Sequence, residues 1–238
     1  MIANETSRLP GRYAAAILIG QYFLMLAAYL ILSTTINWPV SLDDPASIAL
    51  PRLLEFAQPI RTGYTCYLAV GILFIPATIA LNARLRLAGP LAQATLALAI
   101  FSAIAKSIGI SRWLFAMPVL AQAYIVPGAD KATIGVTFDM LNAYAGSIGE
   151  ILGVGLLSGL WTLLVGGVIF SKPGRFTKPL GAFVFVTGVL LLATVPGGFG
   201  VETVFGIAMG DLLTLNGIVW QASLLLIGIW LLTAPRHA

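Results

Sequence analysis

The chain has 238 residues, of which 59% are hydrophobic and 9% charged, and its mean hydropathy is +0.96. This composition leaves too little polar surface for a soluble globular protein and indicates several membrane-spanning segments. The net charge of +4 does not indicate nucleic-acid binding, because the basic residues alternate with apolar segments instead of forming one patch. We therefore expect the lipid bilayer, and no nucleic acid, as a partner.

The cysteine and histidine counts exclude several kinds of site. Cys66 is the only cysteine, so neither an intramolecular disulfide nor a thiolate metal cluster can form within the chain. His237, the only histidine, stands next to the last residue, which excludes a bis-histidine haem and a Ser-His-Asp triad inside the membrane. We expect neither a metal nor a cofactor.

Six apolar segments approach or exceed the length that crosses a bilayer. We predict membrane spans at about residues 13–36, 62–83, 90–110, 147–170, 180–195 and 214–233. The first has a longer apolar core than a signal peptide, so we expect it to be retained. The predicted fold is all-α: a polytopic membrane helix bundle, one integral-membrane domain of six transmembrane helices with short interfacial helices on the outer side.

Two of the outer connections need helices that do not cross the membrane. Between the first two spans, Pro51 can begin a short amphipathic helix that lies in the interface. A straight helix over residues 90–126 would be roughly 55 Å long, too long for one crossing, and it contains Pro118. We therefore predict a break near Ser111. The same argument divides residues 132–170 into an outer helix from about Thr133 and a span from about Ser147.

The distribution of charge predicts the orientation. With six spans and a cytoplasmic N-terminus, the C-terminus is cytoplasmic as well. The cytoplasmic side then holds the following basic residues, against Glu5 alone: Arg8, Arg12, Arg84, Arg86, Lys172, Arg175, Lys178 and Arg236. This excess agrees with the positive-inside rule, and the opposite topology would invert it.

Four charged residues occur where hydrocarbon or its boundary is expected, and together with the neighbouring Trp113 they make up the candidate ligand site: Lys106, Arg112, Trp113, Asp139 and Glu150. Charge at membrane depth is costly, so a functional site is the default hypothesis. Arginine beside an aromatic ring suits recognition of a carboxylate or phosphate, although the same pair also anchors helix ends at the headgroup level.

Glu150 has two interpretations. On a continuous helix, Asp139, Gly146, Glu150 and Gly153 fall on one face, and glycine permits close helix packing there. Glu150 then either faces an internal polar cavity or is the structural partner of one of three basic residues: Lys106, Arg112 or Arg61. The glycine-rich fourth span also offers a face for a membrane-protein partner or a homo-oligomer.

Short motifs carry a resemblance to a known family: Arg112-Trp113, Gly149-Glu150-Ile-Leu-Gly153, Gly159-Leu-Trp161 and Gly166-Gly167. They resemble a broad bacterial family of multi-pass membrane proteins known as a domain of unknown function. The resemblance covers most of the chain and implies a bacterial inner-membrane protein. It brings no catalytic residues with it.

We predict an integral membrane protein with a polar pocket in its outer half that binds or moves a small polar, ionic or amphiphilic ligand. One alternative is an accessory or regulatory subunit that docks a partner through the fourth span. A second is an intramembrane enzyme acting on a lipid or quinone, with Glu150 or Asp139 as acid or base. No paired motif supports an enzyme.

Overall fold

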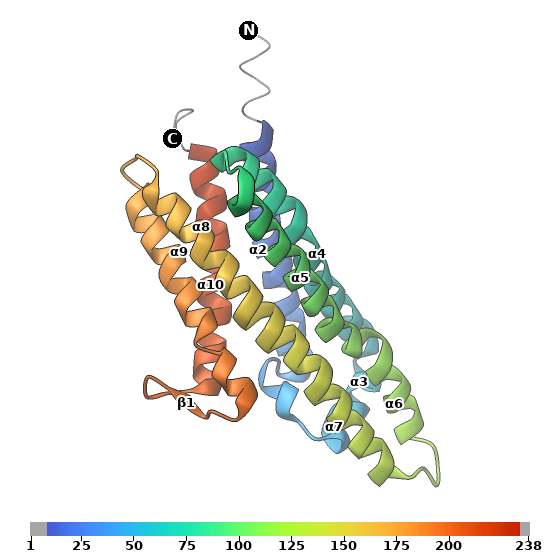
Figure 1. The fold of residues 1–238 in the computed structure, drawn as a ribbon. Coiled ribbons are helices and arrows are strands. Elements are labelled where there is room, and N and C mark those ends of the chain that lie inside the picture. The colour runs from blue at the N-terminus through green and yellow to red at the C-terminus, as the bar shows by residue number, and fades with distance from the viewer. Residues whose placement is uncertain (1–8, 234–238) are drawn as a thin grey trace.

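The fold is a bundle of long helices (Figure 1). The computed structural model describes residues 9–233, and within this range six helices are long and apolar enough to cross a membrane. Each packs against the next along the chain, and the last packs against the first, which closes a ring. The first helix begins and the last helix ends at the same end of the bundle. The predicted all-α membrane bundle of six spans is confirmed.

The helical elements are, in chain order, α2 (Leu9–Ile36), η1 (Val40–Asp43), α3 (Ala46–Glu55), α4 (Ala57–Leu85), α5 (Gly89–Ser111), η2 (Arg112–Ala116), α6 (Met117–Tyr124), α7 (Lys131–Ser147), η3 (Ile148–Ser158), α8 (Gly159–Ser171), α9 (Thr177–Leu192), η4 (Val195–Phe199) and α10 (Met209–Thr233). Of these, η1 and η4 are 3-10 helices, whereas η2 and η3 are π-helical. Two short strands, β1 (Thr203–Val204) and β2 (Ile207–Ala208), form a hairpin before α10.

Two of the six helices are much longer than one crossing requires. The segments α5–η2–α6 and α7–η3–α8 run without interruption over 36 and 41 residues, and they extend together beyond the other helices at the end opposite to the chain termini (Figure 1). The predicted break near Ser111 and the predicted division at Ser147 are therefore wrong. The expected third and fourth spans are parts of these longer helices.

A π-helical segment takes the place of each predicted break. In η2 the backbone N–H of Met117 donates to the carbonyl of Arg112, five residues back. Pro118 follows directly, so the proline that lacks a donor stands where the hydrogen-bond ladder is already shifted. The helix therefore passes the proline without ending.

The short helix α3 also differs from the prediction. It begins at Ala46, and Pro51 lies in its interior instead of at its first position. Its buried residues include Leu50 and Leu53, and it packs against α4, α6 and α7. The helix is thus part of the packed core at this end of the bundle. The second and sixth spans begin earlier than predicted, at Ala57 and Met209.

The bundle has two hydrophobic cores, one after the other along its length. The first fills the ring near the chain termini and includes Phe74, Trp161 and Trp220. The second lies towards the α6–α7 end and includes Tyr64 and Trp113. The candidate site lies where these two cores meet.

Candidate functional site

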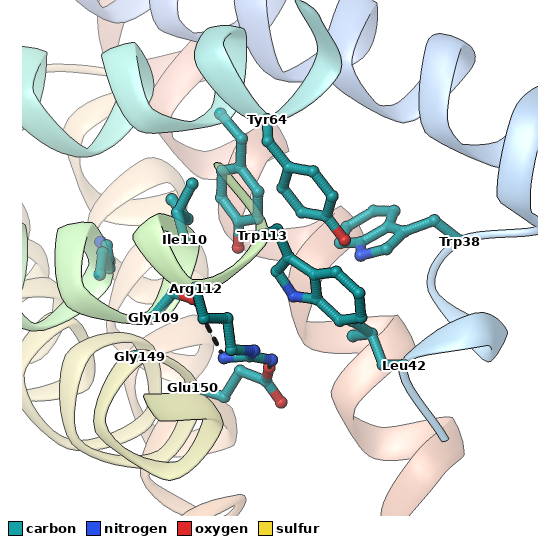
Figure 2. A pocket seen from close by; sticks show the side chains of 11 residues that line it. Trp38, Leu42, Tyr64, Gly109, Ile110, Arg112, Trp113, Gly149 and Glu150 are labelled. Carbon is teal, nitrogen blue, oxygen red and sulfur yellow. Dashed lines mark hydrogen bonds and ion pairs between the residues drawn. The ribbon is translucent and has the colours of Figure 1, made fainter. Parts of the chain in front are cut away.

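Arg112 is held at the start of η2, facing η3. Its Nη1 donates to the carbonyl of Gly109 at 3.1 Å, and its Nη2 lies 3.1 Å from Glu150 Oε1, forming an ion pair (Figure 2). The arginine side chain is 5% exposed and the glutamate side chain 43% exposed. The pair therefore has a buried cation and a half-exposed anion.

Glycines allow this approach between the two long helices. A Cβ on Gly109 would lie 2.8 Å from the Cα of Gly149, a distance that real Cβ atoms essentially never show. A Cβ on Gly146 would lie 3.2 Å from Arg112 Nη2, so the missing side chain leaves room for the guanidinium. The glycine-rich sequence of the fourth span is thus used to bring η3 against α5.

Aromatic rings form one side of the site. The rings of Tyr64 and Trp113 are stacked with centroids 5.6 Å apart and an interplanar angle of 1° (Figure 2). Phe138 packs edge-on against Trp113, and Trp38 packs edge-on against Tyr67. Trp113 is 4% exposed. Its burial argues against the interpretation in which this ring anchors a helix end at the headgroup level.

These side chains line a partly open cavity with about 60 Å³ of space for the centres of water-sized molecules. A single water needs roughly 10–15 Å³ on this measure, so there is room for several. The cavity is lined by Trp38, Leu42, Tyr64, Tyr67, Lys106, Gly109, Ile110, Arg112, Trp113, Gly149 and Glu150. Most of this lining is apolar or aromatic, and its charged residues are Lys106, Arg112 and Glu150.

Lys106 lies one turn and a half from Arg112 on the same helix, inside the ring of helices. Its Nζ is 4.1 Å from the ring centroid of Trp220 and 4.6 Å from that of Phe74. The residue is 4% exposed, and among residues 9–233 it has neither a hydrogen bond nor an ion pair. Two aromatic faces therefore take the place of a carboxylate partner.

Four of the five residues in the predicted site line this one cavity: Lys106, Arg112, Trp113 and Glu150. Asp139 is not among its lining residues, and its side chain is exposed on α7. Of the three basic partners considered for Glu150, the structure selects Arg112, while Arg61 is exposed.

Several residues of the cavity wall are not predicted from the sequence. Tyr64 and Tyr67 are three residues apart in the second span, so they share a helix face, and this spacing could have indicated a site. Trp38 and Leu42 come from the connection between α2 and α3, and no sequence pattern connects them to Arg112. The described residues bring no three His, Cys, Asp or Glu side chains together.

Comparison with known proteins places the chain in one family. The family model described as "Domain of unknown function (DUF4386)" matches residues 18–234. Searches of curated proteins and of solved structures found no match. The resemblance to a family of unknown function is therefore confirmed, and the chain belongs to the DUF4386 family.

Proposed function

We propose that this membrane protein binds a small amphiphilic ligand in the cavity beside Arg112. The observation that supports this most directly is a buried arginine, with its Nε unpaired, in the wall of an open cavity between several helices. Charge at membrane depth is expensive, and a purely structural ion pair gains from excluding such space. A cavity of this kind, lined mostly by apolar and aromatic groups with a few polar ones, has the usual composition of a ligand site.

Movement of the ligand belongs to the same proposal. Arg112 opens η2, and Glu150 lies near the start of η3, so both partners of the ion pair stand in π-helical turns. Such turns occur frequently at functional sites. Conversion of one π turn to α-helix changes the register by one residue, which rotates the following side chains by roughly 100°. Such a change would separate Arg112 from Glu150 and alter access to the cavity.

The charge distribution supports an orientation for this site. At the end of the bundle where α2 begins, the described charged residues are all basic: Arg12, Arg84, Arg86, Lys172, Arg175 and Lys178. We propose that this end is cytoplasmic, by the positive-inside rule, and that the cavity lies in the outer half. Arg8, Arg236 and Glu5, which entered the prediction, lie outside the described residues. A bacterial inner membrane remains the proposed location.

No specific observation favours the two rival functions. The glycines of the fourth span pack largely within the chain: Gly149 and Gly153 face α5, and Gly166 faces α9. A partner or a second copy would therefore have to use another face of this helix, and its existence remains a prediction. For an enzyme, Glu150 is engaged with Arg112, and Asp139 lies away from the cavity.

Filling the cavity tests the proposal. Ile110 lines it, whereas Ile108 on the same helix is exposed. Native mass spectrometry of the purified protein should detect a retained small amphiphile, and Ile110→Phe should lose it. Ile108→Phe, the matched control, should keep it. Equal retention in both variants, or no retained molecule in the wild-type protein, would argue against ligand binding at this site.

A further inference from the structure

The cavity wall carries hydrogen-bond donors that have no partner. Within the described part of the chain, three buried side-chain atoms of cavity residues make no hydrogen bond: Tyr64 Oη, Arg112 Nε and Trp113 Nε1. All three residues are more than nine-tenths buried. Arg112 Nε and Trp113 Nε1 can only donate, and the tyrosine hydroxyl can do so as well. The group that completes this site is therefore an acceptor.

The guanidinium of Arg112 can donate more hydrogen bonds than it does. Glu150 accepts from Nη2 and Gly109 from Nη1, but Nε is left over. A guanidinium binds planar oxyanions through two parallel bonds, which are stronger than bonds between neutral groups. The indole nitrogen of Trp113 lies on the side of its ring that faces the Arg112–Glu150 pair (Figure 2).

The charges of the cavity favour the same kind of ligand. Lys106 and Arg112 contribute two basic groups to the wall, and Glu150 is its one acidic group. Lys106 has no carboxylate partner among the described residues. Water in the cavity can accept hydrogen bonds from the free donors, but a negatively charged oxygen accepts more strongly from a guanidinium.

We propose that the ligand carries an oxyanion, a carboxylate or a phosphate, and that small side-chain rotations let Arg112 Nε, Trp113 Nε1 and Tyr64 Oη, which neighbouring atoms now cover, donate hydrogen bonds to it. Its apolar part lies along Trp38 and Ile110. This inference rests on the proposed function, since it names the chemical class of the ligand in the same cavity. The oxyanion belongs either to a membrane amphiphile or to a small free anion.

A set of radiolabelled probes with one tail and different heads tests the charge. Dodecanoate, dodecanol and dodecyltrimethylammonium are added to the full chain in phosphatidylcholine nanodiscs, and binding to empty nanodiscs is subtracted. We expect specific binding of dodecanoate alone, with competition by dodecyl phosphate. Competition by acetate or inorganic phosphate at similar concentrations assigns the site to a free anion, and its absence assigns it to an amphiphile.

Two variants test the donors. Tyr64→Phe removes a hydroxyl that has no partner, so it should not lower the stability of the empty protein. It should weaken dodecanoate binding about 10-fold or more, as should Trp113→Phe, because a hydrogen bond to a charged group is lost. Tyr144→Phe, which removes an exposed hydroxyl outside the cavity, is the matched control and should bind like the wild-type protein.

The outcomes separate this inference from the proposed function. Equal binding of the neutral, cationic and anionic probes, or unchanged dodecanoate affinity in both cavity variants, overturns the oxyanion but leaves an amphiphile site in place. Preference for the cationic or neutral probe does the same. If no probe binds specifically and no molecule is retained on purification, both proposals fail.

Discussion

Glu150→Gln perturbs the ion pair of the site without changing its shape. The glutamine keeps a side-chain oxygen where Glu150 Oε1 lies, 3.1 Å from Arg112 Nη2, but it removes the negative charge. The guanidinium remains, with its side chain 5% exposed and its charge uncompensated. We therefore expect this substitution to lower the free energy of unfolding.

The expected loss lies between two limits. Removing one partner of a fully buried pair costs about 3–5 kcal/mol, whereas an exposed pair is worth about 0–1 kcal/mol. Glu150 is 43% exposed, so water screens the pair at that end and the upper limit does not apply. The buried state of Arg112 excludes the lower limit. We expect a loss of about 1–3 kcal/mol.

The chain contains a matched control for this substitution. Arg52 Nη1 also lies 3.1 Å from a carboxylate oxygen, that of Asp44, but these side chains are 44% and 25% exposed. Asp44→Asn should therefore cost at most about 1 kcal/mol. The apparent free energy of unfolding is measured for both variants by titrating the detergent-solubilised protein with SDS.

A double variant tests whether the uncompensated charge of Arg112 causes the loss of stability in Glu150→Gln. Arg112→Gln combined with Glu150→Gln leaves no uncompensated charge, so the two losses should not add. If Glu150→Gln and Asp44→Asn cost the same, the burial of Arg112 does not determine the strength of its pair. Additive losses in the double variant would likewise refute the reasoning.

Two further predictions concern helix packing and topology. Gly149→Ala should lower the free energy of unfolding by about 1–3 kcal/mol, because its Cβ would lie 2.9 Å from the Cα of Gly109. Gly167→Ala is the control: its Cβ would have nothing within 4 Å, so the same SDS titration should show no change or a slight gain. In a Cys66→Ser background, a cysteine placed at Gly174 should react with an impermeant thiol reagent only after the membrane is opened. Labelling of intact cells would place the α8–α9 loop outside and overturn the proposed orientation.

The sequence predicts the number of apolar helices well because hydrophobicity is summed over many residues. It fails where a single local feature determines whether a helix ends. Length and Pro118 predict the end of an α-helix, but η2 shifts the hydrogen-bond ladder and the helix continues. No pattern in residues 112–116 indicates a π-helix. Periodicity also does not indicate the hairpin after which α10 begins, at Met209.

The candidate site was predicted in part for a related reason. Counting from Asp139 in steps of three and four residues predicts a face through Gly146, Glu150 and Gly153, and both glycines do pack there, against Arg112 and Lys106. The prediction fails only at its first residue, because Phe138 is buried at that level and Asp139 is exposed. The glycines predict the packed face of this helix better than the charged residues do. A close helix contact requires glycine at the contact point, whereas a long carboxylate side chain can contact a neighbour from the edge of the face.

Both partners of the ion pair stand at the beginning of π-helical segments. Each segment inserts a residue into its helix, so it changes which side chains face the neighbouring helix. The close contact of Gly109 with Gly149 brings Arg112 and Glu150, 38 residues apart, into contact, while Arg112 Nε has no partner. The ion pair and the unpaired donor both depend on how η2 faces η3, so a change that restores regular α-helix in either segment should disturb both.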